Sequence, residues 1–188
     1  MTSIGRILFA FLIASSLSMS PAASAQKRLQ LYNAGAWVDT GTVSYSGQVT
    51  LSSGGIVMPC ISDWTLTLTN GAGSFSGMTQ SGSISCAGTV AQHLPWPTSQ
   101  SEYNGVNPPF AGAPTLPAPL HLIRIGGVRL SAPAPLNTDC PSSFSTATIN
   151  AYMDSSGAIV FKSALGPCGF QTAPNQKLVP NVPVRAVW

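Results

Sequence analysis

Charged residues are scarce in this sequence of 188 residues. Eight lysines and arginines and five aspartates and glutamates make up 7% of the chain, whereas an ordinary soluble domain carries about 25%. The basic residues are scattered along the chain, which argues against a nucleic-acid-binding surface, and we expect no nucleic-acid partner. A surface made mainly of Ser, Thr, Asn, Gln and Gly gives weak repulsion between copies, so we expect self-association or adsorption to a surface.

The patterns of catalytic and metal-binding sites are also missing. Only His93 and His121 could act as a base, and no nucleophile pattern stands beside either of them. There is no Gly-x-Ser-x-Gly motif of a serine hydrolase and no Cys-x-x-Cys, and the isolated acids form neither a glycosidase pair nor a calcium loop. We therefore expect a protein that is not an enzyme and that binds no cofactor or metal.

The longest apolar run lies at the N-terminus. Arg6 precedes an apolar stretch from Ile7 to Leu17, and this N-terminal segment ends in Ala23-x-Ala25, as signal peptidase sites do. The stretch is shorter than the roughly 20 residues that a membrane-spanning helix needs. We predict a signal peptide over residues 1–25, cleaved after Ala25, and a secreted periplasmic or extracellular domain over 26–188 with no transmembrane span.

Apolar residues alternate with small polar ones in several stretches of the predicted domain. This period of two, bounded by Gly, Asn and Ser, is typical of half-buried strands, and no amphipathic helix is evident after residue 25. The pattern predicts an all-β fold, an antiparallel β-sandwich or a partly open barrel. Alternation at residues 181–188 also resembles the end of an outer-membrane barrel, but heavy proline use and short strands favour an edge strand. The clearest stretches are Thr42–Leu51, Trp64–Thr69, Leu120–Leu130, Phe144–Met153 and Ala158–Leu165.

Four cysteines, Cys60, Cys86, Cys140 and Cys168, predict two disulfides in an exported protein. Four cysteines allow three connectivities, and spacing alone does not choose among them. The surroundings of Cys60 and Cys140 match, however, with a glycine 13 residues before and an aromatic residue four residues after each. We interpret this as a weak repeat of two similar halves, 26–96 and 120–188, and predict the pairs Cys60–Cys86 and Cys140–Cys168.

A proline-rich segment, residues 97–119, separates the two halves. Because proline fixes φ and donates no backbone hydrogen bond, we predict a long surface loop there, of the length that is usually functional or mobile. Just before it, Leu94-Pro95-Trp96 is either a stiff structural corner that caps the core, the interpretation we favour, or a ligand platform. The candidate surface-binding residues are Trp96, Tyr103 and Phe110.

The order of these motifs resembles a known family. "LSSGGIVMPC", an aromatic strand, "SGSISCAG", "HLPW" and then two further cysteines follow one another as in the secreted bacterial family of alkane oxidation protein activators called PraB. The resemblance runs from about Thr42 to Gly169, and its most specific element is Leu94-Pro95-Trp96 after the second cysteine. It implies a secreted, non-catalytic protein linked to growth on long-chain hydrocarbons and, in some members, to biofilms.

Two roles follow as expectations. The protein is either an accessory protein that contacts cell or apolar surfaces such as hydrocarbon, or a self-assembling biofilm matrix or adhesin subunit whose partners are its own copies. Exposed apolar side chains favour the first role, and a long unpaired strand edge favours the second.

Overall fold

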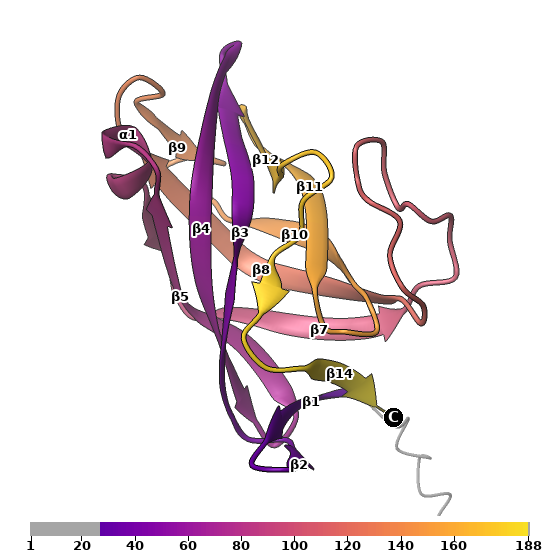
Figure 1. Cartoon of the computed structure of the whole chain (residues 1–188). Helices are drawn as coiled ribbons and strands as arrows, with labels where there is room; N and C mark the ends of the chain where they lie inside the picture. Colours follow the sequence, from indigo (N-terminus) through magenta and orange to yellow (C-terminus); the bar gives the residue numbers. More distant parts are fainter. Residues whose placement is uncertain (1–26, 188) are drawn as a thin grey trace, which may run out of the picture.

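The computed structural model describes residues 27–187, so the predicted signal peptide at 1–25 lies outside the described residues. The fold is almost entirely antiparallel β-structure (Figure 1), with one helical turn, α1, in the described part. The elements are β1 (Arg28–Asn33), β2 (Ala36–Val38), β3 (Gly41–Ser53), β4 (Ile56–Thr69), β5 (Ala72–Ser81), α1 (Ile84–Ala87), β6 (Val90–Gln92), β7 (Trp96–Glu102), β8 (His121–Ala132), β9 (Thr138–Cys140), β10 (Ala147–Met153), β11 (Ile159–Leu165), β12 (Cys168–Thr172), β13 (Val179–Pro180) and β14 (Val184–Val187).

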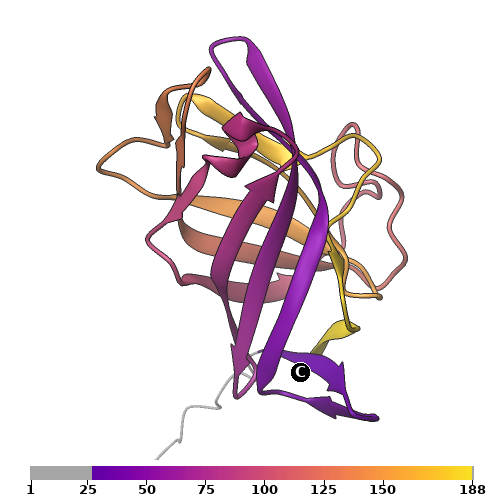
Figure 2. The same cartoon turned by 60° about the vertical axis from the view of Figure 1, so that its left-hand side comes forward.

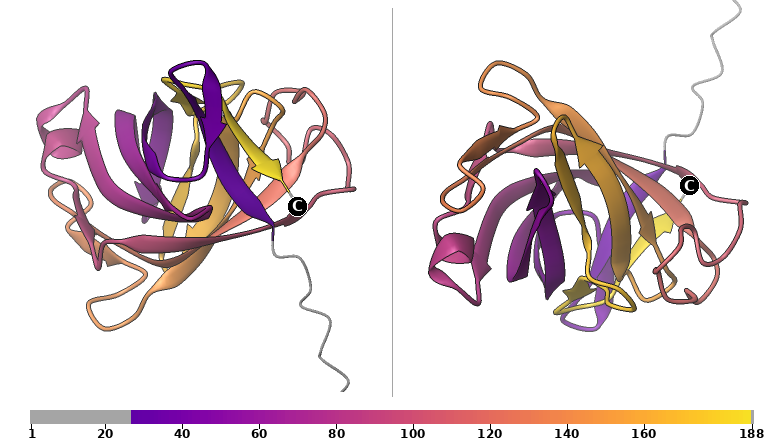
Figure 3. Two further views of the ribbon diagram at one scale, coloured as in Figure 1. Left: turned by 90° about the horizontal axis from the view of Figure 1, so that it is seen from below. Right: turned by 90° about the horizontal axis from the view of Figure 1, so that it is seen from above.

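Eight of these strands form a closed barrel. Each of β3, β4, β5, β7, β8, β10, β11 and β12 pairs with the next in that order, and β12 pairs back with β3. The β12–β3 pairing, from Cys168 opposite Ser53 to Thr172 opposite Val49, joins the two halves of the chain, and the β8–β10 pairing completes the ring within the second half. The predicted antiparallel all-β fold is therefore confirmed, as a barrel rather than two facing sheets (Figures 2 and 3).

The longest hairpin, β3–β4, shows why the sequence forms these strands. In β4 every second residue from Met58 to Leu68 is buried, while the residues between them face outward. Gly54 and Gly55 connect the two strands with φ of 58° and 83°, values that an ordinary L-residue adopts only at a cost. Asn70 and Gly71, with φ of 51° and 81°, form the same kind of two-residue turn between β4 and β5.

Aromatic side chains fill the barrel. The fully buried Trp64 ring lies 5.0 Å from Phe75, 5.5 Å from Phe161 and 5.9 Å from Trp96, measured between ring centroids. Its indole nitrogen donates a hydrogen bond to Ser62 Oγ at 2.7 Å, which satisfies a polar group that burial would otherwise penalise. With side chains on the barrel axis, the outer surface and the loops are where a partner can bind.

A separate three-stranded sheet, in the order β14-β1-β2, lies at the end of the barrel where the described chain begins and ends. Leu29 and Leu31 of β1 and Val184 of β14 are buried and belong to the main core. The predicted strand at the end of the chain is thus present as β14, an edge strand of this small sheet, although Trp188 lies outside the described residues.

The proline-rich loop is shorter than predicted. Residues 97–102 belong to β7, which pairs with β8 from Thr98 opposite Ile125 to Glu102 opposite His121. The physical reason is that Thr98–Glu102 contains no proline and can form a full ladder, whereas the prolines of the segment lie at Pro97 and after Asn107. The irregular segment is 103–120.

Both predicted disulfides are confirmed. Cys60 of β4 is bonded to Cys86 of α1, and Cys140 of β9 is bonded to Cys168 of β12, with Cα atoms 5.7 and 5.8 Å apart. Each bond encloses a hairpin, β4–β5 in the first half and β10–β11 in the second. No helix in residues 27–187 is long and apolar enough to cross a membrane.

Candidate functional site

Both disulfides lie toward the same end of the barrel. The β3–β4 turn pairs with the start of β12 there, where Ser53 faces Cys168. Gly88, just after α1, lies against Pro133, and Gly166 lies against Pro141, so loops from both halves meet at this end. We call it the disulfide end and define it by residues 52–61, 82–90, 132–146 and 164–168 (upper left and top in Figure 1).

Most of the exposed large apolar side chains of the described chain are at the disulfide end. Val57 on the β3–β4 hairpin is 62% exposed, Ile84 on α1 is 93% exposed and Phe144 before β10 is 97% exposed. Such exposure is unfavourable for a large apolar side chain in water unless something covers it. Nine such side chains are exposed within residues 27–187, and six of them are Ile56, Val57, Ile61, Ile84, Val90 and Phe144.

The disulfide end also has very little charge. Asp139 is the one charged residue within its four segments, and its carboxylate lies 3.6 Å from the Arg129 guanidinium of β8. The remaining polar groups there are Ser, Thr, Asn and backbone. The desolvation of charged groups is usually the largest free-energy cost of moving a protein surface into an apolar phase. At the disulfide end this cost is limited to one ion pair.

The opposite end of the barrel holds most of the charge. Glu102 lies 3.3 Å from Lys27, Asp154 lies 2.7 Å from Lys177, and Arg28 lies 3.8 Å from Asp39. The Arg185 guanidinium stacks over the Trp37 ring, 4.1 Å from its centroid. Along its barrel the protein is thus amphipathic, with an apolar, disulfide-bonded end and a charged end.

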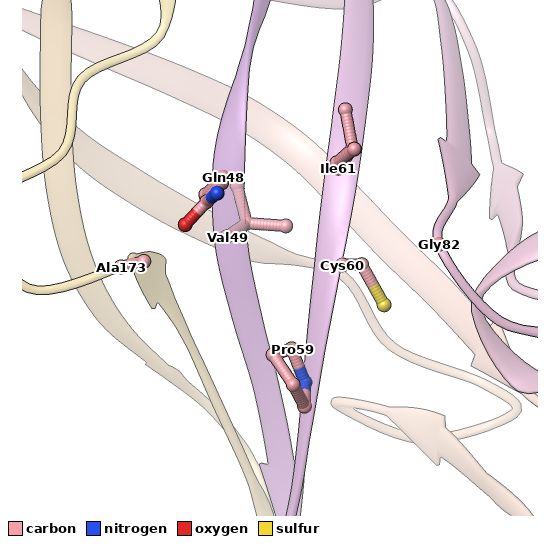
Figure 4. Close-up of a pocket in the computed structure, with 7 residues that line it drawn as sticks. All are labelled: Gln48, Val49, Pro59, Cys60, Ile61, Gly82 and Ala173. Carbon is pink, nitrogen blue, oxygen red and sulfur yellow. The ribbon is translucent and has the colours of Figure 1, made fainter.

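A small hollow beside the Cys60–Cys86 bond extends the disulfide end (Figure 4). It has a volume of about 170 Å³ and crosses the β3–β4 pair, with Pro59, Cys60 and Ile61 on β4. No charged side chain lines it. The hollow is too small for a drug-sized ligand, whose pockets span about 300–1,000 Å³. It is a shallow depression without charged side chains beside the exposed apolar residues.

Trp96 is not on the surface. Its side chain has no exposed area, its ring packs against Trp64, and its indole nitrogen donates a hydrogen bond of 2.8 Å to the Gln92 carbonyl. A side chain with no exposed area cannot contact a surface ligand, so Trp96 leaves the set of candidate surface-binding residues. Its position agrees with the structural corner that we favoured from the sequence.

Tyr103 and Phe110 are half-buried in the irregular segment, far from the disulfide end. Both pack on Tyr152 of β10, with centroids 4.7 and 6.2 Å from its ring, and burial raises the pKa of Tyr152, as does Tyr103 beside it. They join a small second core with Ala113, Leu116, Leu120 and Val160. This core fixes the segment on the barrel wall, so Tyr103 and Phe110 have a packing role whether or not they also bind a ligand.

The sequence reasoning missed the apolar residues of the disulfide end. Ile56, Ile84 and Phe144 come from three distant segments, and each directly follows Gly or Ser. The available indication was their position beside the cysteines, since each lies four residues or fewer from Cys60, Cys86 or Cys140.

Comparisons with known proteins add no assignment. No protein-family model, no curated protein and no solved structure matches this chain. The resemblance to the alkane oxidation activators rests on the quoted motifs alone.

Proposed function

We propose that this chain is a secreted, non-enzymatic accessory protein that contacts apolar surfaces such as hydrocarbon through its disulfide end. The observation that carries the proposal is the gathering of six exposed apolar side chains at an end with one charged residue. The resemblance to activators of long-chain alkane utilisation points to the same material. The two disulfides and the N-terminal pattern support export, because stable disulfides form in oxidising compartments.

The energetics favour attachment by this end. Full burial of an exposed Val, Ile or Phe side chain contributes about 1.5–3 kcal/mol, so Val57, Ile84 and Phe144 together can supply several kcal/mol. The opposite end carries five charged residues with exposed or partly exposed side chains, which keep it in water: Arg28, Asp39, Glu102, Lys177 and Arg185. The protein would therefore stand on an oil surface with its N- and C-terminal strands toward water.

The second candidate, a matrix or adhesin subunit that polymerises through strand edges, has less support. Closure of the barrel pairs β3, β4 and β8 on both sides over most of their length, although β5 pairs with β7 only at Ser74 and Phe75. The edges of the small sheet, β2 and β14, have three and four residues. Short edges of this kind are poor templates for strand addition.

Another stretch of edge is at the tip of β4, because β5 pairs with β4 only from Ile61 onward. Ser53 and Ile56 close a two-residue turn and form a hydrogen-bonded pair, and such pairs alternate along an antiparallel ladder. Pro59, opposite Thr50, therefore turns its backbone nitrogen to the free side of β4. Proline has no N–H to donate, so this edge is blocked at its centre.

The proposal is tested by partition of the purified protein between buffer and hexadecane droplets. We compare the wild type with Ile56→Ser/Val57→Ser and Ile84→Ser/Phe144→Ser. The matched control is Val106→Ser/Val179→Ser, which removes two exposed valines outside the disulfide end. All these side chains are exposed, so the melting temperature should stay within a few degrees in every variant.

We expect the two disulfide-end variants to lose at least tenfold in droplet attachment while the control keeps it. Equal loss in all three variants would indicate non-specific adsorption and reject the site. Attachment that survives in both disulfide-end variants, together with polymers of the wild-type protein in buffer, would favour the matrix role.

A further inference from the structure

A second cavity lies at the charged end of the barrel, far from the apolar surface proposed above. Its volume is about 500 Å³, and it opens where β7 ends, β8 begins and the irregular segment 103–120 leaves and rejoins the barrel. Glu102, Tyr103 and Asn104 line it on one side, and Pro119, Leu120 and His121 on the other. This volume is in the range of small-molecule sites.

The cavity is preformed, because its walls are held by hydrogen bonds and packing. The Asn107 amide donates to the Leu116 carbonyl at 2.8 Å and accepts from the Leu116 N–H at 3.0 Å, which clamps the segment across its width. The Tyr103 N–H donates to the Leu120 carbonyl at 3.1 Å, which closes the base of the segment. Because these walls are already held in place, binding of a ligand orders few protein groups and costs little conformational entropy of the protein.

Polar groups converge on the cavity from two adjacent strands. Glu102 and His121 face each other across the β7–β8 ladder, and Lys27 Nζ lies 3.3 Å from Glu102 Oε1. The Glu102 side chain is half-exposed, whereas that of Lys27 is 2% exposed, so the carboxylate is the member of the pair that a ligand can reach. His121 Nδ1 is shielded from solvent and has no hydrogen-bond partner among the described residues.

The charges of the site favour a neutral ligand. Lys27 compensates Glu102, which leaves no net charge to attract an anion or a cation. No group of three or more His, Cys, Asp or Glu side chains in residues 27–187 is placed to hold a metal ion. The groups that remain are the Glu102 carboxylate, the His121 imidazole and the exposed Asn104 amide, beside the Tyr103 ring. The three polar groups can form hydrogen bonds with hydroxyl groups of a ligand, and the aromatic ring can pack against its C–H groups.

We propose that this cavity binds one neutral sugar residue of a polysaccharide. Glu102 accepts hydrogen bonds from hydroxyl groups of the sugar, His121 and Asn104 contact further hydroxyls, and Tyr103 packs against the ring. Hydrogen bonds from a hydroxyl to a carboxylate are about twice as strong as neutral ones, so Glu102 is the main anchor. A sugar site opposite the apolar end would let the protein join hydrocarbon to a polysaccharide layer, but the site itself does not depend on the proposed hydrocarbon contact.

The test is an NMR titration of the ¹⁵N-labelled secreted protein with the methyl glycosides of glucose, mannose and galactose. Inorganic phosphate and magnesium chloride, added separately, are the charged probes. We expect one of the glycosides to shift amide signals of residues 102–107 and 118–121 with millimolar affinity. Shifts there with phosphate or magnesium alone, or no shift with any glycoside, would overturn the proposal.

Two variants identify the binding groups. Glu102→Gln should weaken glycoside binding at least tenfold, and Asn104→Ala should weaken it about threefold, in line with the loss of one charged and one neutral hydrogen bond. Asp63→Asn, which changes an exposed carboxylate on β4, is the matched control and should bind as the wild type does. Because Glu102→Gln also alters the partner of Lys27, Asn104→Ala decides the matter if the first variant fails to fold. Unchanged binding in Asn104→Ala contradicts the site, and so does a loss in Asp63→Asn as large as that in Glu102→Gln.

Discussion

The Lys177 ammonium lies 2.7 Å from the buried carboxylate of Asp154 and ties the chain after β12 to the β10–β11 turn. The other carboxylate oxygen of Asp154 accepts hydrogen bonds from the N–H groups of Ser156 and Ala158 at 2.9 and 3.1 Å. Two backbone N–H groups of the turn and the Lys177 ammonium thus stabilise the buried carboxylate of Asp154. Lys177 precedes Leu178, which forms a β-bridge with Ile159 of β11.

We predict that Asp154→Asn lowers the free energy of unfolding by about 3 kcal/mol. Removal of one partner of a buried ion pair costs about 3–5 kcal/mol, and the lower end applies because Lys177 is a quarter exposed. Urea unfolding measures the change. Arg28→Met, which breaks the exposed pair with Asp39, is the control and should cost less than about 1 kcal/mol. Equal losses in the two variants would contradict the role given to Asp154.

A second prediction concerns the disulfides. Replacement of Cys60 and Cys86 with alanine should cost roughly 3 to 4 kcal/mol, and so should replacement of Cys140 and Cys168, because the closed loops are of similar length. The first pair also anchors α1, so its loss should expose residues 82–90 to proteolysis before the barrel unfolds. Limited proteolysis with mass spectrometry tests this. First cleavage within the barrel strands of the Cys60→Ala/Cys86→Ala variant would show that α1 is held by other contacts.

The local parts of the fold could be predicted from the sequence. The alternation from Trp64 to Thr69 marks a strand, and the cysteine surroundings mark the correct pairing, because both are short-range patterns. The predicted strand Trp64–Thr69 begins eight residues after the start of β4. Pro59 argues against a strand in the sequence, but in the structure its nitrogen faces the free side of β4, where no hydrogen bond is lost.

The arrangement of distant segments could not be predicted in the same way. An alternating strand looks alike in a sandwich and in a barrel, and the pairings of strands that are distant in the sequence, such as β12 with β3, decide between them. The disulfide end and the cavity at Glu102 and His121 likewise combine residues from separate segments of the chain. The burial of Trp96 agrees with a corner stiffened by a proline on each side, whereas the apolar residues Ile84 and Phe144 have no local pattern that marks them as a surface.

The third prediction concerns Trp96. Trp96→Ala should lower the free energy of unfolding by about 3–5 kcal/mol, since it removes a fully buried aromatic side chain that packs against Trp64. Droplet attachment of the folded fraction should stay at the wild-type level, because Trp96 has no exposed surface. Phe110→Ala, in the smaller second core, should be less damaging. An unchanged melting temperature with loss of attachment to hexadecane would restore the ligand-platform interpretation of Leu94-Pro95-Trp96.

The last prediction is a dependence of stability on pH that originates at His121. Burial lowers the pKa of His121 below its ordinary value of 6.5, and the Lys27 ammonium lowers it further, while Glu102 partly opposes them. In the window between the lowered pKa and 6.5 the unfolded chain binds more protons than the folded chain, so the free energy of unfolding rises with pH. The stabilising contribution of neutral His121 is complete above 6.5 and is lost as the pH falls through this window.

Urea unfolding at several pH values between about 5 and 8 measures the slope, in a range where aspartate and glutamate of ordinary pKa are already ionised. His121→Gln should flatten the slope, whereas His93→Gln, at an exposed position beside Arg129, should keep it. A slope that disappears in His93→Gln and persists in His121→Gln would show that the pH dependence originates outside the cavity.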